Sequence, residues 1–178
     1  MLSKKEREMI VEIWERIIPV AEDVGSDALL RPIRATKCVT WPLPSCTPTE
    51  GVNSIQNCLT RTRATVDMMF ATYPGTKTYF NHWDISPHSP NLRSHGKKIV
   101  LAIAEGAKDI SQLTVTLAPL QTYHAYQLRI DPTNFKLFSH CMLVALAVHL
   151  RDDFTEVHHA AMDKFLSAFA AVLAEKYR

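Results

Sequence analysis

Apolar residues in the first part of the chain follow a helical period. Ile10 and Ile17 fall on one face of a helix. Ser3 followed by Glu6 forms a capping-box signature at the start of this stretch. Proline is disfavoured inside a helix, so the first helix should span about four turns and end near Pro19.

A second helix is expected from Val20 or Ala21 to Leu30. Gly25 lies inside it and has two interpretations. It weakens the helix by about 1 kcal/mol, or its missing Cβ lets another helix approach closely. Pro32 disfavours helical geometry at Arg31, so the helix should stop there.

The pattern changes over residues 32–68. This stretch contains four prolines, seven threonines and three of the four cysteines, and it has no helical period. A long segment of this kind is unusual inside a compact domain. We therefore expect an irregular insertion.

Helical periodicity returns at residue 69 and continues to the end of the chain. A long helix should begin at Ser89–Pro90, because serine caps a helix and proline suits its first turn. Another should start with Asp131–Pro132 and run to about Leu150, and the last should follow the N-cap Thr155. The pattern predicts one all-α domain over residues 1–178, with about seven helices and no sheet.

Composition narrows the functional classes. A net charge of +2 gives no basic field for nucleic acid. The charged first residues do not form a signal peptide, and the longest apolar run, Cys141–Val148, is too short to cross a membrane. No C-x-x-C pair suggests a zinc site. An intracellular protein that binds neither nucleic acid nor a membrane is expected.

Two histidines are the candidate chemistry. His124 closes a short helical segment beside Leu117, Leu120 and Leu128, where it could be an axial ligand to iron. The commoner role for such a histidine is a hydrogen-bonded core residue. His95 lies 29 residues upstream on an amphipathic helix, where the alternative is a solvent-facing side chain.

Five motifs occur in order: TKTYF at residues 76–80, HGKK at 95–98, HAYQLRIDPTNFKL at 124–137, SHC at 139–141 and KYR at 176–178. With them the chain resembles a globin, and more narrowly the alpha-type chains of vertebrate haemoglobin, over residues 1–31 and 69–178. The resemblance implies a globin fold of seven to eight helices around a haem pocket. It also places a small residue at position 25, which favours close helix packing there.

The resemblance implies haem b between the His95 and His124 helices. His124 would be the proximal iron ligand, with its other ring N–H bonded to the carbonyl of Leu120. His95 would donate a hydrogen bond to oxygen, and Ile99 would crowd the same ligand. Phe80 would stack on the porphyrin and His82 would reach a propionate. The other implied pocket contacts are Met69, Tyr79, Trp83, Leu120, Leu128, Ile130, Asn134, Phe135, Phe138 and Leu173, each of which is also a plausible core residue.

The implied assembly is an alpha2-beta2 heterotetramer with beta-type globin chains in the red cell. Tyr79, Asp131, Pro132 and Asn134 would form its sliding contact, and His140 and His159 its tighter contact. Tyr177 and Arg178 would form terminal contacts with Asp163 and Lys164 of a partner subunit. Composition alone would make the terminal Lys-Tyr-Arg a frayed tail.

The chain departs from this pattern in two places. Tyr123 precedes His124 where leucine is usual. Residues 32–68 interrupt the second helix, so that Arg31 is separated from Met69 and Met68 stands where the uninterrupted chain would have arginine. That arginine contributes to the tight subunit contact in the family. We interpret the insertion as translated intervening sequence or an error of gene prediction, which leaves haem binding intact and weakens assembly.

Three functions compete at this point. The first is reversible oxygen transport without enzymatic activity. The second is a haem enzyme such as a peroxidase or nitric-oxide dioxygenase, for which the chain has no reductase domain or second catalytic carboxylate. The third is a sensor or electron-transfer globin in which His95 itself coordinates iron. The visible spectrum of the reduced protein separates the first from the third.

Overall fold

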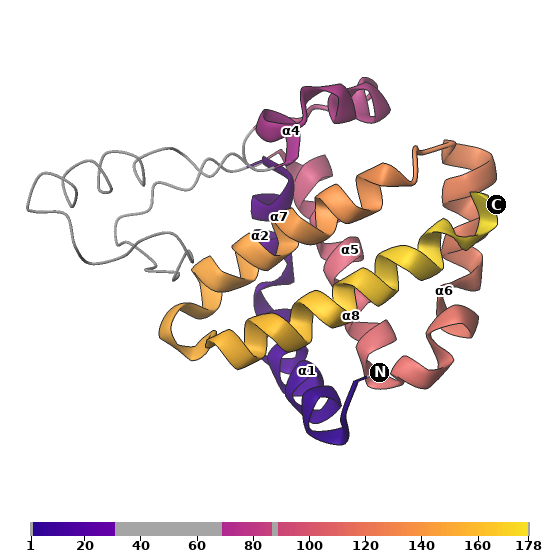
Figure 1. Ribbon diagram of the computed structural model, residues 1–178. Helices are drawn as coiled ribbons and strands as arrows, with labels where there is room; N and C mark the ends of the chain where they lie inside the picture. Colours follow the sequence, from indigo (N-terminus) through magenta and orange to yellow (C-terminus); the bar gives the residue numbers. More distant parts are fainter. Residues whose placement is uncertain (1, 31–68, 87–88, 178) are drawn as a thin grey trace, which may run out of the picture.

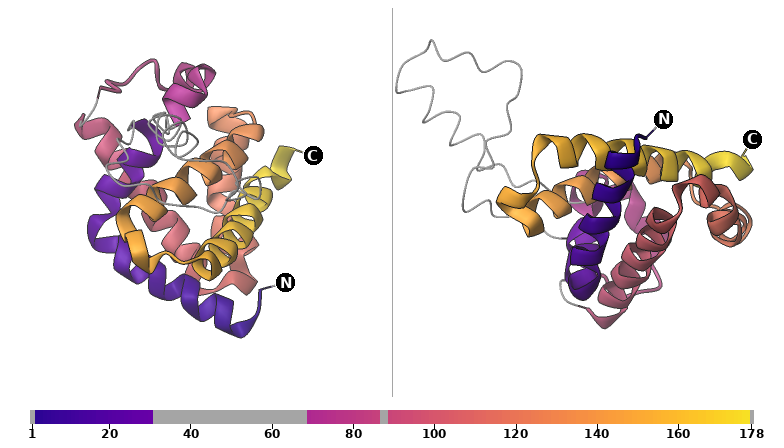
Figure 2. Two further views of the ribbon diagram at one scale, coloured as in Figure 1. Left: turned by 60° about the vertical axis from the view of Figure 1, so that its left-hand side comes forward. Right: turned by 90° about the horizontal axis from the view of Figure 1, so that it is seen from below.

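A computed structural model of the chain describes residues 2–30, 69–86 and 89–177. These ranges contain helices and no β-strand. Helices α7 and α8 lie side by side, while α5 crosses α2 (Figure 1; Figure 2). In chain order the elements are α1 (Lys4–Ile17), η1 (Ile18–Val20), α2 (Ala21–Leu30), α4 (Met69–Thr72), η2 (Pro74–Phe80), α5 (Pro90–Lys108), η3 (Ile110–Gln112), α6 (Leu113–Thr122), η4 (Tyr123–Leu128), α7 (Thr133–Leu150), η5 (Arg151–Asp153), α8 (Glu156–Ala174) and η6 (Glu175–Tyr177).

The predicted helix starts are confirmed by their caps. The Glu6 backbone N–H donates to Ser3 Oγ over 3.2 Å, and the Ser3 N–H donates back to the Glu6 carboxylate over 2.7 Å. The Leu92 N–H donates to Ser89 Oγ over 3.3 Å at the start of α5. Thr155 is the N-cap of α8. These bonds satisfy backbone donors that have no partner within the helix.

The start of α7 differs slightly from the prediction. The helix begins at Thr133, so Pro132 is the cap residue rather than part of the first turn. Asp131 Oδ1 accepts the Thr133 N–H over 2.9 Å. The aspartate therefore supplies the capping oxygen.

Close packing at Gly25 is confirmed. A Cβ at Gly25 would lie 2.2 Å from the carbonyl oxygen of Gly96, and one at Gly96 would lie 2.5 Å from the Gly25 carbonyl carbon. Neither position has room for a side chain. The two backbones therefore meet where α2 crosses α5.

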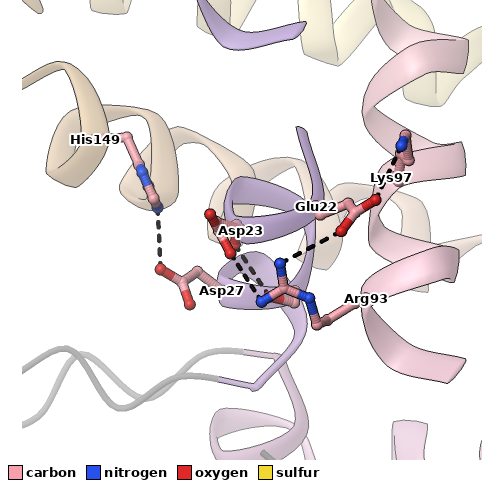
Figure 3. Close-up of polar contacts among 7 residues, drawn as sticks. Glu22, Asp23, Asp27, Arg93, Lys97 and His149 are labelled. Atoms are coloured by element: carbon pink, nitrogen blue, oxygen red, sulfur yellow. Dashed lines mark hydrogen bonds and ion pairs between the residues drawn. The ribbon is translucent and has the colours of Figure 1, made fainter. Parts of the chain in front are cut away.

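Charged residues flank this crossing on its exposed side (Figure 3). Glu22 accepts from Lys97 at 2.9 Å and from Arg93 at 3.3 Å, and Arg93 also pairs with Asp23 at 3.0 Å. The bond from Lys97, followed by that from Arg93, lowers the pKa of Glu22. Because solvent screens exposed pairs of this type, they orient the crossing more than they stabilise it.

A more buried pair joins α2 to α7. His149 Nε2 lies 3.0 Å from Asp27 Oδ2, and the side chains are 22% and 10% exposed (Figure 3). A polar group that loses its partner in such a place keeps its desolvation cost. The contact therefore fixes the position of α2 against α7.

The apolar core lies between α1, α2, α5, α7 and α8. Burial of each large apolar side chain contributes roughly 1.5–3 kcal/mol. The indole N–H of Trp14 is buried there and has no hydrogen-bond partner among the residues that the structure describes. The largest fully buried side chains are Trp14, Phe70, Phe165, Ile10, Ile17, Leu29, Leu92, Ile103, Leu117, Met142 and Leu146.

By length and composition, the stretch Thr133–Asp153, which contains α7, could also cross a membrane. Its buried residues include Cys141, Met142 and Leu146, which belong to the apolar core. The apolar composition of α7 is therefore also that of a helix packed inside a protein.

The predicted insertion at residues 32–68, together with Arg31, lies outside the described residues. The break of the second helix at Pro32 lies outside them as well. What is described on either side is α2, which ends at Leu30, and α4, which begins at Met69. Helices α2 and α4 contact one another.

Candidate functional site

His124 is held by a hydrogen bond to the residue one turn before it. Its Nδ1 lies 2.7 Å from the carbonyl oxygen of Leu120. Because a carbonyl only accepts, Nδ1 carries the proton and Nε2 keeps a free lone pair. The expected bond between these two residues is therefore present. An imidazole fixed in this way is prepared to bind a metal through Nε2.

The local backbone explains why this bond forms. Leu120 O also accepts the Tyr123 N–H, and from Tyr123 the helix widens into the π-helical turn η4. The His124 carbonyl accepts the N–H groups of Arg129 and Ile130, which close this turn. A π-turn within a helix is rare and is often found at functional sites.

The His124 ring has a partly buried, aromatic environment. The Phe135 ring lies edge-on at 5.6 Å and the Tyr123 ring at 6.1 Å between centroids. Burial lowers the pKa of His124, although the bond to Leu120 acts in the opposite direction. The imidazole is therefore kept neutral, which metal binding requires.

His95 lies on α5 and is held differently. Its ring is 5.1 Å from the Trp83 ring and 5.5 Å from the Phe80 ring, both in edge-on contact. Burial lowers its pKa to about 4, with smaller contributions from the charges of His124 and Lys98. The charge of His124 is among the causes of this shift, so the two imidazoles interact electrostatically. Neutral His95 retains one N–H donor.

The other predicted pocket residues are buried to different degrees. Met69 and Leu173 are buried, and His82 is exposed in the turn after η2. Leu128 is 40% exposed, which is more than we expect for a residue that lines a pocket. The partly buried members are Tyr79, Phe80, Trp83, Ile99, Leu120, Ile130, Asn134, Phe135 and Phe138.

Two residues near the site were missed from the sequence. The Phe70 ring packs edge-on against Phe80 at 5.0 Å and is fully buried. Gln121 is 2% exposed, and its Nε2 donates to the Val172 carbonyl over 2.6 Å. This bond ties α6 to α8 beside His124. The aromatic run at 70–83 could have revealed Phe70, but a helical glutamine gives no sign of burial.

Some residues that were predicted to contact a partner subunit make contacts within this chain. Tyr79 Oη accepts the backbone N–H of Asp131 over 3.1 Å. The Tyr177 ring packs against Phe135 at 6.1 Å, and its buried hydroxyl has no hydrogen-bond partner in the described part of the chain. Burial raises the pKa of Tyr177, and the charges of Tyr79 and Asp131 add to the effect. These residues therefore form one junction between η2, η6 and the start of α7.

The remaining predicted contact residues lie on α7 and α8. Lys164 Nζ bonds Glu6 over 2.6 Å, and this bond is the largest cause that lowers the pKa of Glu6 to about 2. His140 and Asp163 are exposed, while His159 packs on Phe154 at 6.0 Å. Pro132 and Asn134 are partly buried, and Arg178 lies outside the described residues.

A comparison with known protein families shows which family the chain belongs to. Residues 63–173 match the family model described as globin. The chain belongs to the globin family. This globin is 41% identical to haemoglobin subunit alpha-D of Anser indicus and of Branta canadensis, and 40% identical to that of Chrysemys picta bellii. Each alignment covers all of both chains.

The family explains the arrangement of the helices described above. This globin is of the alpha type, and its described residues form an all-α globin fold, as the motifs predicted. The match to the family model begins at residue 63, within the predicted insertion, and continues through α8 as far as residue 173.

Proposed function

We propose that this globin carries oxygen reversibly as an alpha-type haemoglobin subunit. The observation that carries the proposal is the His124 ring, whose Nδ1 is committed to Leu120 at 2.7 Å and whose Nε2 is free. The second imidazole, His95, interacts electrostatically with His124 and is held neutral by burial, which supports its place in the same proposed site. One histidine fixed for a metal and one left as a donor suit reversible gas binding.

The residues present fit a haem b. When bound, this group supplies a ferrous iron that takes up oxygen reversibly. His124 would hold the iron from one side, and the Phe80 ring would support the porphyrin. The half-buried apolar side chains of Ile99, Leu120 and Phe138 would exclude bulk water, and exposed His82 could reach a propionate.

His95 would stabilise the ligand through its ring N–H. Because burial holds its pKa at about 4, the imidazole is neutral at physiological pH. A hydrogen bond in a dry pocket contributes about 1–3 kcal/mol, equivalent to roughly ten- to a hundredfold in affinity. Ile99, one turn further along α5, would restrict the space beside that N–H.

The relatives suggest the setting in which this globin acts. They are haemoglobin subunits, so we infer an alpha2-beta2 heterotetramer with beta-type chains in the red cell. Tyr79, Asp131, Pro132 and Asn134 would provide its sliding contact, and His140 and His159 the tighter one. Tyr177, Asp163 and Arg178 would act at the terminal contacts. Lys164 is already paired with Glu6, so its contact with a partner would require sharing or exchange.

Replacing the proximal ligand tests the proposal. In His124→Gly, haem uptake should be lost and should return, at least in part, when imidazole is supplied. The measurement is haem titration followed by visible absorbance. The proposal would be wrong if the variant still took up haem and released oxygen reversibly without added imidazole.

The reduced wild-type spectrum separates this role from the alternatives. We expect a five-coordinate ferrous spectrum that becomes oxy-type in air. A six-coordinate bis-histidine spectrum would instead favour a sensor or an electron-transfer protein. Steady turnover of peroxide or nitric oxide with a reductant, at rates above those of free haem, would favour an enzyme.

We also propose that residues 1–178 form one globin domain with a dispensable insertion at 32–68. The full chain and a form without these residues should both bind haem. Mixed with a beta-type chain, the shortened form should bind oxygen cooperatively, while the full chain should assemble poorly. Equal oxygen equilibrium curves for both would contradict a harmful insertion.

A further inference from the structure

The part of the chain that carries His124 has few attachments to the rest of the protein. We name residues 119–128, from the end of α6 through η4, the proximal segment. Within it, Gln121 is the one buried side chain. Pro119 has no N–H to donate to the preceding turn of α6, and the π-turn that follows is a rare backbone form. The backbone therefore gives this segment little stability of its own.

Gln121 continues the buried face of α6. The buried residues of this helix are Leu113, Leu117 and Gln121, which are four residues apart and therefore lie on one side of it. Helix α6 contacts both α8 and η6 (Figure 1). Position 121 thus has the burial of a core residue but carries a polar side chain. Burying an unpaired amide costs free energy, so this glutamine needs hydrogen-bond partners on the neighbouring elements.

Both partners of the Gln121 amide lie where α8 ends. Its Nε2 donates to the Val172 carbonyl over 2.6 Å and to the Glu175 carboxylate over 3.2 Å. A side-chain amide has two N–H groups, so one nitrogen can make both bonds. Phe169 and Leu173 hold this end of α8 in the apolar core. Gln121 therefore bonds the proximal segment to a part of the protein that is itself fixed.

We propose that Gln121 is a positioning residue that anchors the proximal segment to the end of α8, so that His124 is in place to receive the haem iron. The two residues are three apart, which is less than one turn of helix. A shift of Gln121 therefore moves the backbone of His124 with it. The consequences for haem rest on the proposed function, whereas the anchoring of the haem-free chain does not depend on it.

Amide hydrogen exchange of the haem-free chain tests the anchor directly. Gln121→Met keeps a side chain of similar length but has no donor. Exchange of the amides of the proximal segment should become about two- to tenfold faster, the range that one net hydrogen bond contributes. Gln121→Ala removes both bonds and leaves a void, so its exchange should be more than about tenfold faster. Core amides of α1 and α5 should exchange as in the wild type in both variants.

The haem-loaded chain shows whether the anchor acts through His124. Haem loss to an excess of a haem-free acceptor globin, followed by visible absorbance, should be about two- to tenfold faster in Gln121→Met, because the histidine is held less firmly. In His124→Gly with imidazole supplied, the ligand of the iron is no longer joined to the chain. In that background, Gln121→Met should leave the rate of haem loss unchanged.

Gln127→Met is the matched control, since it makes the same change three residues after His124, at an exposed side chain. It should leave the rates of exchange and of haem loss unchanged. The inference would be overturned by less than a twofold change in exchange in Gln121→Met, by an equal change in Gln127→Met, or by faster exchange without faster haem loss. An equal change in haem loss in the His124→Gly background would also overturn it. A wild-type chain that fails to bind haem would instead refute the proposed function, and hydrogen exchange would still decide whether Gln121 anchors the segment.

Discussion

The α2–α5 crossing and the wall of the proposed haem site are built in contrasting ways. At the crossing, two α-helices meet through Gly25 and Gly96, with no space between their backbones. The site wall consists of η2 and η4, which are 3-10 and π-helical, and among their residues only Thr76 is buried. The crossing is thus specified by close packing, and the wall by a few bonds and ring contacts.

This difference separates stability from function. A change at the crossing must move backbone atoms, and packed interiors resist such movement. A change in the wall reorients a side chain that carries chemistry, at a smaller cost in folding free energy. Substitutions at the two regions should therefore divide into those that unfold the protein and those that alter ligand binding.

The largest effect is expected for Gly25→Ala. Its new Cβ would lie 2.2 Å from the Gly96 carbonyl oxygen, so the helices must separate. We expect a loss of more than about 3 kcal/mol, beyond the usual range for overpacking. Urea unfolding followed by circular dichroism measures it. The control is Gly75→Ala, because no atom lies within 4 Å of a Cβ there. Similar stability of the two variants would contradict the description of the crossing.

His95, which lies on α5 and packs against Phe80 of the site wall, should make stability depend on pH. The pKa of His95 falls from 6.5 to about 4 on folding. As pH falls from 6.5 to 4, the unfolded chain therefore binds a proton that the folded chain does not, and stability decreases. The loss can reach about 3 kcal/mol and levels off below pH 4. His95→Gln should remove this contribution, as urea unfolding at pH 7.5 and 4.5 would show. If the stability of the variant changed with pH in parallel with that of the wild type, His95 would not be the source of the pH dependence.

The buried pair between α2 and α7 should have an intermediate effect. His149→Ala leaves Asp27, which is 10% exposed, without this partner. The expected cost is about 1–3 kcal/mol. Lys97→Ala, at the solvent-screened pair with Glu22, should cost less than His149→Ala. Thermal unfolding of the two variants measures the difference between their losses in stability. A larger loss for Lys97→Ala than for His149→Ala would show that burial does not decide how much each pair contributes.

The smallest effect is a gain in stability at the end of α7. Arg151 has φ 52° and ψ −125°, a conformation that favours glycine. Arg151→Gly should stabilise the chain by about 1 kcal/mol. Arg129, at the end of η4, has φ 51° and ψ 44°, the left-handed helical region that other residues tolerate better. Arg129→Gly should therefore stabilise the chain less than Arg151→Gly. A larger gain in stability for Arg129→Gly would show more backbone strain at the end of η4 than at the end of α7.

Sequence signals that act over a few residues predicted their elements well. The Ser3–Glu6 capping box and the Ser89 cap both appear with the expected bonds, because partners three residues apart meet as soon as the helix forms. The His124–Leu120 bond belongs to the same class, since residues four apart share one helix face. The globin motifs added the roles of the two histidines, which periodicity alone could not supply.

The sequence by itself therefore determined most of the long helices, the caps at Ser3, Ser89 and Thr155, and the support of His124. Only the tertiary structure decided how His95 is held, why Gln121 is buried and which histidine Asp27 meets. Their partners lie on other elements, and Gln121 and Asp27 are joined to theirs across 51 and 122 residues. Such contacts exist only after the helices have packed, so no local pattern records them.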